Sequence, residues 1–176
     1  MKNDYILKWA FSYQTTSKKY GCFFKKTILL SGCISTGRDI ASAMQMGADL
    51  AYMGTRFINT KESKAPEAYR DMIIDAGASD IVYTAAVSGV PANFSGPSLK
   101  AMGITEEMLN KKVKVDFGEE LTAQEDEAKA WATIWSAGQG VSTIKDSPSV
   151  SDLIANLKNE FKAVIEEQYT LLERYK

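Results

Sequence analysis

From residue 27 onward, apolar and polar residues follow one another in two kinds of block. Short apolar runs flanked by turn residues have the length and composition of buried strands, at Thr27–Ser31, Asp49–Met53 and Asp80–Val87. Longer stretches carry apolar residues at helical spacing, at residues 36–47, 65–76 and 150–174. Strands that alternate with helices of this length predict parallel βαβ units with right-handed crossovers.

Local signals mark the ends of these helices. Thr36 and Asp39 form a capping box, and Ile40, Ala43, Met44 and Gly47 follow on one predicted face. Pro66 suits the first turn of the second helix and Gly77 its end. The long final helix is predicted to pack through one amphipathic stripe, which consists of Leu153, Ile154, Leu157, Phe161, Ile165, Tyr169 and Leu172.

The regular alternation stops after residue 88. Residues 89–94 and 95–98 are rich in glycine, proline and serine, which predicts a loop. A short helix is expected at about 105–112, and a longer one over Glu125–Trp135 ends in the turn Ser136–Gly140.

The composition changes near residue 26. Residues 1–26 carry six lysines against one acid and have aromatic residues without sustained periodicity. We therefore expect a separate N-terminal segment over 1–26, disordered or encoded in a shifted frame, and one folded region over 27–176.

Charge and apolar content limit the classes of function. With a net charge of -1, the chain lacks the basic field that attracts nucleic acid. No apolar run approaches the ~18 residues of a membrane span, and the first residues are too polar for a signal peptide. We expect a cytoplasmic protein whose two cysteines are reduced.

Two glycine turns, each closing a predicted strand, are the main candidate site. The first is Ser31-Gly32-Cys33 and the second is Met53-Gly54-Thr55. A strand that ends in glycine exposes main-chain N–H groups where the next helix begins, and the helix dipole near Thr36 would add to their attraction for phosphate. Either turn alone is also explained by the backbone angles that glycine permits, but neighbouring parallel strands would bring both to one rim.

Other candidates have a structural explanation beside the functional one. Arg38 and Arg56 could add charge to a phosphate site or form ion pairs at the surface. Gln139 could hydrogen-bond a ring-shaped ligand, or its turn could simply end a helix. Trp131 and Trp135 are more typical of core packing than of a stacking platform, and Cys33 of an inert thiol.

No catalytic group emerges from the sequence. The chain has no histidine, and its carboxylates, lysines and tyrosines show no spacing typical of acid–base pairs or metal ligands. We therefore assign no catalytic residue and no metal site.

The stretch from about Thr27 to Arg174 resembles the C-terminal part of the nitronate monooxygenases, formerly called 2-nitropropane dioxygenases. The segments that carry the resemblance are Ser31–Arg38, Ala48–Phe57, Thr60–Ser63, Val82–Thr84, Ser88–Phe94 and Trp135–Gly140.

The resemblance implies an FMN-dependent TIM-barrel oxidoreductase that oxidises alkyl nitronates with O₂. Main-chain amides of a Gly-Gly turn and a Met-Gly-Thr turn hold the FMN phosphate in that family. Here these positions are Gly32 and Cys33, then Met53, Gly54 and Thr55, with Gln139 in a loop near the flavin. Cys33 departs from the family's second glycine.

A complete barrel needs about 250 residues, so we expect an α/β fold made of the last three βα units of a TIM barrel plus C-terminal helices. The strands that carry the family's catalytic histidine have no counterpart here, which suggests a truncated chain. Two alternatives stay open: an inactive fragment that self-associates through an exposed sheet edge, and another FMN- or phosphate-binding barrel, such as a flavin enoyl reductase or a dehydrogenase of nucleotide monophosphates.

Overall fold

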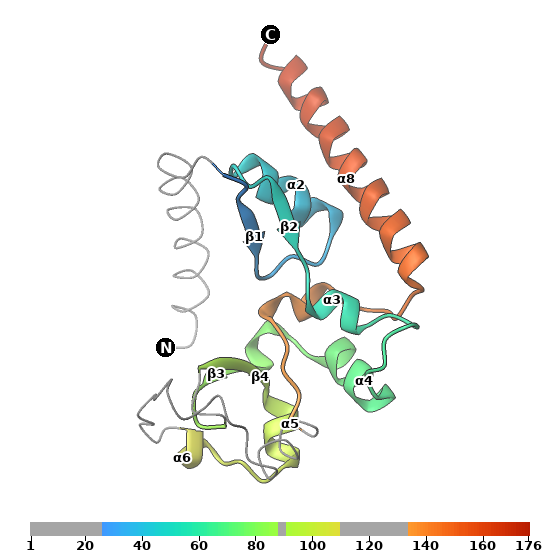
Figure 1. The fold of residues 1–176 in the computed structure, drawn as a ribbon. Helices are drawn as coiled ribbons and strands as arrows, with labels where there is room; N and C mark the ends of the chain where they lie inside the picture. The colour runs from blue at the N-terminus through green and yellow to red at the C-terminus, as the bar shows by residue number, and fades with distance from the viewer. Residues whose placement is uncertain (1–25, 88–90, 110–133) are drawn as a thin grey trace. The chain divides into compact units, whose positions relative to one another are not determined.

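The structure, a computed structural model of the chain, describes residues 26–87, 91–109 and 134–176. They form two compact units (Figure 1). Unit 1 combines the part of the chain before Gly54 with the part from Ser149 onward, and unit 2 is Gly54–Pro148. The predicted segment 1–26 lies outside the described residues except for Lys26.

The elements of unit 1 are β1 (Leu29–Ser31), α2 (Gly37–Gln45), β2 (Leu50–Tyr52) and α8 (Val150–Glu173). Those of unit 2 are α3 (Thr55–Ile58), α4 (Glu67–Asp75), the 3₁₀ turn η1 (Ala78–Asp80), β3 (Ile81–Thr84), β4 (Ala92–Ser95), α5 (Gly96–Ala101), α6 (Glu106–Leu109) and the 3₁₀ turn η2 (Gln139–Thr143).

Unit 1 contains the parallel βαβ unit that the pattern predicts. β1 and β2 pair in parallel, with Ser31 opposite Tyr52, and α2 connects them. One face of this pair packs on α2 around the buried residues Ile34, Ala43 and Ala48. Side chains on the other face are more than half exposed, namely Leu29, Leu50 and Tyr52.

The capping box that the sequence predicts begins α2. The N–H of Asp39 donates to Thr36 Oγ1 at 3.1 Å, and the N–H of Thr36 donates to Asp39 Oδ2 at 2.9 Å. The predicted apolar face is only partly right, because Met44 is exposed whereas Ala41 is buried. The reason is that α2 packs on the sheet and on α8 at once, so small residues face both neighbours.

α8 is the long amphipathic helix that the sequence predicts. It lies along α2 (Figure 1) and buries Leu153, Leu157 and Val164. A helix of 24 residues is about 36 Å long, whereas the nine residues of α2 cover about 14 Å. The later part of the predicted stripe therefore extends beyond α2, and Tyr169 and Leu172 are exposed.

A third parallel βα unit is not confirmed in the described residues. β3, within the predicted strand 80–87, pairs antiparallel with β4 in a separate two-stranded sheet, with Ile81 opposite Ser95 and Thr84 opposite Ala92. The connection from Thr84 to Ala92 is too short for a parallel crossover, which needs a dozen or more residues, so β3 and β4 pair as an antiparallel hairpin. The fold is α/β, and the parallel pairing in the described residues is that of β1 with β2.

The expected loop over 89–98 is also corrected. Residues 88–90 lie outside the described part, but 92–95 form β4 and 96–101 form α5 with Pro97 in its first turn. Phe94 in β4 is fully buried against Leu99 and Ile134, so a hydrophobic contact stabilises a segment whose local composition favours a turn.

The predicted helix over 125–135 falls mostly outside the described residues, including Trp131. Its final residues, 134 and 135, are not helical, because Ser136 forms an antiparallel bridge with Phe94. α6 begins where the short helix at 105–112 is predicted, and its last predicted residues, 110–112, lie outside the described part.

Candidate functional site

The first predicted glycine turn follows β1 at the surface of unit 1. Gly32 has φ of 99° and Cys33 has φ of 55°, and both residues are exposed. A positive φ is uncommon for a residue with a side chain, and Cys33 is the one non-glycine residue that adopts it in the described part of the chain. The main chain therefore keeps, at Cys33, a conformation that favours glycine.

This strained position gives a first prediction. Replacing Cys33 with glycine should raise the free energy of unfolding by about 1 kcal/mol, because glycine avoids the cost of a left-handed conformation. Replacing the exposed helical Ser42 with glycine should lower it by a similar amount. Urea unfolding of the three proteins measures both effects, and a destabilised Cys33→Gly variant would contradict the strained conformation.

The N-terminus of α2, just after this turn, is occupied by the chain's own carboxylates. Asp39 Oδ2 accepts the N–H groups of Ser35 and Thr36, and Glu160 Oε2 of α8 accepts the N–H of Gly37 at 2.6 Å. The expectation that this helix terminus helps to hold a phosphate is therefore corrected. An anion at the turn would depend on the amides of Gly32 and Cys33.

Met53, the next predicted residue, follows β2. Because β1 and β2 are parallel and in register, Gly32, Cys33 and Met53 all follow the carboxyl ends of their strands at one edge of the sheet. The side chain of Met53 packs against the core of unit 1, so its main chain is the part left for a ligand.

Gly54, Thr55 and Gln139 belong to unit 2. A Cβ at Gly54 would meet no atom within 4 Å, so its main chain borders open space. Thr55 Oγ1 accepts the N–H of Gly138 at 3.0 Å, which brings Thr55 beside the turn that carries Gln139. The structure thus brings the predicted residues together in two groups of three, one group in each unit.

An aromatic pair that the sequence analysis missed supports the same turn. The ring of Tyr69 stacks on Trp135 with 5.0 Å between ring centroids and 12° between planes. The Tyr69 hydroxyl donates to the main-chain oxygen of Ser136. Burial raises the pKa of the Tyr69 phenol, so the hydroxyl stays protonated and remains a donor. Trp135 thus packs against Tyr69, which agrees with the interpretation of this tryptophan as a packing residue rather than a stacking platform for a ligand.

Both candidate arginines form ion pairs. Arg38 Nη2 on α2 lies 2.8 Å from Glu167 of α8, and both side chains are largely exposed. Arg56 is buried in unit 2, where it donates to Asp146 Oδ1 at 2.6 Å and to the Asp146 main-chain oxygen at 3.2 Å. These contacts favour the structural explanation over a phosphate contact for both residues.

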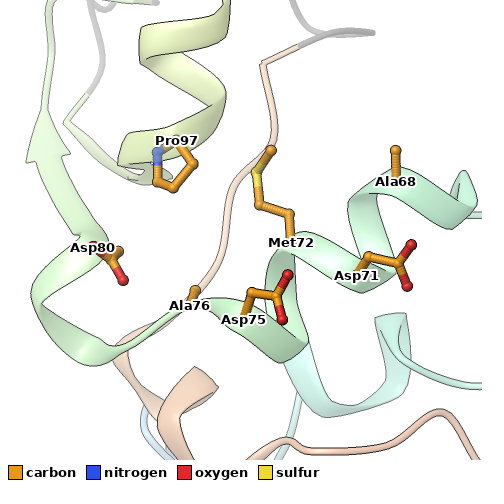
Figure 2. Close-up of a pocket in the computed structure, with 7 residues that line it drawn as sticks. All are labelled: Ala68, Asp71, Met72, Asp75, Ala76, Asp80 and Pro97. Carbon is orange, nitrogen blue, oxygen red and sulfur yellow. The ribbon is translucent and has the colours of Figure 1, made fainter.

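A pocket of about 420 Å³ lies in unit 2, and none of the predicted site residues lines it (Figure 2). Asp71 and Asp75 of α4 line it together with Asp80 and Pro97. Within the described ranges, no group of three or more histidine, cysteine or acidic residues is arranged to hold a metal ion. Among the helices described, none combines the length and apolar character needed to cross a bilayer.

Comparisons with known proteins identify a family for most of the chain. The sequence profile of the family named Nitronate monooxygenase matches residues 27–160. A nitronate monooxygenase of Paraburkholderia phytofirmans is 31% identical over an alignment of 148 positions, and the alignment covers 80% of this chain and 39% of that protein. The chain thus spans well under half the length of this relative.

Two solved structures share the fold. A point mutant of FabK from Thermotoga maritima has a TM-score of 0.66 at 26% identity and covers 90% of this chain and 48% of its own. A nitroalkane oxidase from Streptomyces ansochromogenes has a TM-score of 0.70 at 22% identity and covers 89% of this chain and 45% of its own.

Proposed function

The chain belongs to the nitronate monooxygenase family, and on that premise we propose that it serves the FMN-dependent oxidation of alkyl nitronates by O₂. The β1–α2–β2 unit would be two consecutive strands of a (β/α) barrel with their connecting helix. Bound FMN would take electrons from the nitronate and pass them to O₂. The part of this chain would be to hold and orient the flavin.

The conformation of Cys33 is the observation that carries this proposal. The family's turn has a second glycine where this chain has cysteine, which raises the question of whether a phosphate still fits. The left-handed φ of 55° at Cys33 and the exposure of Gly32 and Cys33 favour a fit, because main-chain N–H groups rather than side chains would bind the phosphate. Met53 would contribute in the same way, and Gly54 and Thr55 are the next residues of the chain.

The phosphate and the ring of FMN would depend on different residues. We assign the phosphate to the amides of Gly32, Cys33, Met53, Gly54 and Thr55. Gln139 would serve the flavin ring, because a carboxamide offers both a donor and an acceptor. No residue of the chain is assigned to proton transfer.

A charge placed at Cys33 tests the phosphate assignment. Asparagine and aspartate tolerate the left-handed conformation about equally and differ by one charge. Cys33→Asp should weaken FMN binding at least about tenfold through repulsion of the phosphate, whereas Cys33→Asn should bind FMN like the unmodified chain. Fluorescence titration with FMN and with riboflavin measures this, because riboflavin lacks the phosphate.

Riboflavin provides the internal control. Its affinity should be the same for Cys33→Asp and Cys33→Asn. An equal loss for both flavins would indicate a distorted turn, and equal FMN binding by both variants would place the phosphate elsewhere. Turnover of a propionate nitronate against an enoyl thioester separates the proposed activity from that of a flavin enoyl reductase.

A further inference from the structure

The turn that carries Gln139 is held in place by α3, α4 and α5 in addition to its bridge with β4. Thr55 at the start of α3 accepts the Gly138 N–H, and Tyr69 of α4 donates to the Ser136 oxygen. Ser98 of α5 accepts the N–H of Trp135 through its Oγ at 2.8 Å. Each of these bonds uses the main chain of residues 135–138, so none of them occupies the Gln139 side chain.

Gln139 is half-buried at the first position of η2. In the part of the chain that the structure describes, no hydrogen bond engages its carboxamide. A half-buried carboxamide on a turn fixed by its neighbours is well suited to ligand contact, because little conformational entropy is lost when it binds.

We propose that Thr55 is a positioning residue that acts through Gln139. The inference rests on the proposed function and concerns what the Thr55 side chain adds to it. Any residue could supply a main-chain amide to a phosphate, whereas the bond to Gly138 requires a side-chain acceptor at this position. The hydroxyl of Thr55 therefore couples the last residue of the second glycine turn to the placement of the proposed flavin-ring ligand Gln139.

Substitutions of Thr55 test this coupling in the full chain. Thr55→Val keeps the shape of the side chain and removes the acceptor, so it should weaken FMN and riboflavin binding by the same factor, about fivefold. Thr55→Ser keeps the acceptor and should restore both affinities. Thr170→Val is the matched control, because the exposed Thr170 hydroxyl donates to the main-chain oxygen of Glu166 within α8, in the other unit.

A double variant separates positioning from direct contact. If Thr55 acts through Gln139, Thr55→Val combined with Gln139→Ala should bind flavin no more weakly than Gln139→Ala alone. In the protein without flavin, amide hydrogen exchange at Gly138 should be faster in Thr55→Val than in Thr170→Val.

The outcomes distinguish this inference from the function on which it rests. Failure of the unmodified chain to bind any flavin would overturn both. Flavin binding that is unchanged in Thr55→Val would overturn the positioning role alone. A loss of FMN affinity with riboflavin unchanged would also overturn it, because it would assign the hydroxyl to the phosphate.

Discussion

Replacing Gly37 with alanine should lower the free energy of unfolding by about 3 kcal/mol or more. An added Cβ would lie 2.3 Å from the main-chain oxygen of Leu157 and 2.5 Å from the main-chain nitrogen of Phe161. These are backbone atoms of α8 and cannot rotate away. The two helices would have to separate, which would also break the bond from Gly37 to Glu160.

Urea unfolding followed by helical circular dichroism measures this loss, because α8 is the longest of the described helices. Gly77→Ala is the matched control, since its Cβ would meet only side-chain atoms at 3.6 Å or more. Arg38→Ala removes the exposed ion pair between the same two helices and should cost less than about 1 kcal/mol. A Gly37→Ala protein as stable as these controls would show that α2 and α8 do not approach at Gly37.

Replacing Asp146 with alanine should cost about 2 kcal/mol, the second largest effect that we expect. The Arg56 side chain is 9% exposed and that of Asp146 is 62% exposed. The substitution would leave a buried guanidinium with one main-chain oxygen as its remaining acceptor. Water that reaches the exposed side of the pair moderates the loss, so we expect less than for a fully buried pair.

Removing both charges provides the sharper test. The double variant with Arg56→Met and Asp146→Ala should be more stable than Asp146→Ala, because no charge is left buried without a partner. Asp71→Ala on the exposed face of α4 should change stability by less than about 0.5 kcal/mol. A double variant less stable than Asp146→Ala would mean that the methylene groups of Arg56, rather than its charge, matter at this position.

Elements with short-range signals were predictable from the sequence. Thr36 and Asp39 lie three residues apart and form the expected capping box, and α8 was predicted within a residue of its observed ends. β3 was predicted as a strand, but its antiparallel partner β4 was not predicted. Its pairing with β4 depends on Phe94, whose burial against Leu99 and Ile134 has no local signal.

In the candidate site, too, local features were predictable from the sequence, whereas contacts between distant residues were not. The turn at Gly32 and Cys33 follows a strand, and the glycine pattern was sufficient to select it. Glu160 and Tyr69 were missed because they act on residues 123 and 67 positions away along the chain. A carboxylate facing a helix N-terminus on a distant helix is visible only once the helices are packed together.

The order of these contacts along the chain has a consequence for biosynthesis. Unit 2 is one continuous stretch, whereas unit 1 needs α8, which follows β2 only after the whole of Gly54–Pro148. At about 5–20 residues per second, a ribosome needs about 5–20 s to make that stretch. During this interval α8 has not yet been made. The N–H of Gly37 in α2 therefore lacks its acceptor, the Glu160 carboxylate, and Gly37, which is buried in the folded protein, is exposed. We therefore expect unit 1 to be the late-folding part and the one that depends on chaperones.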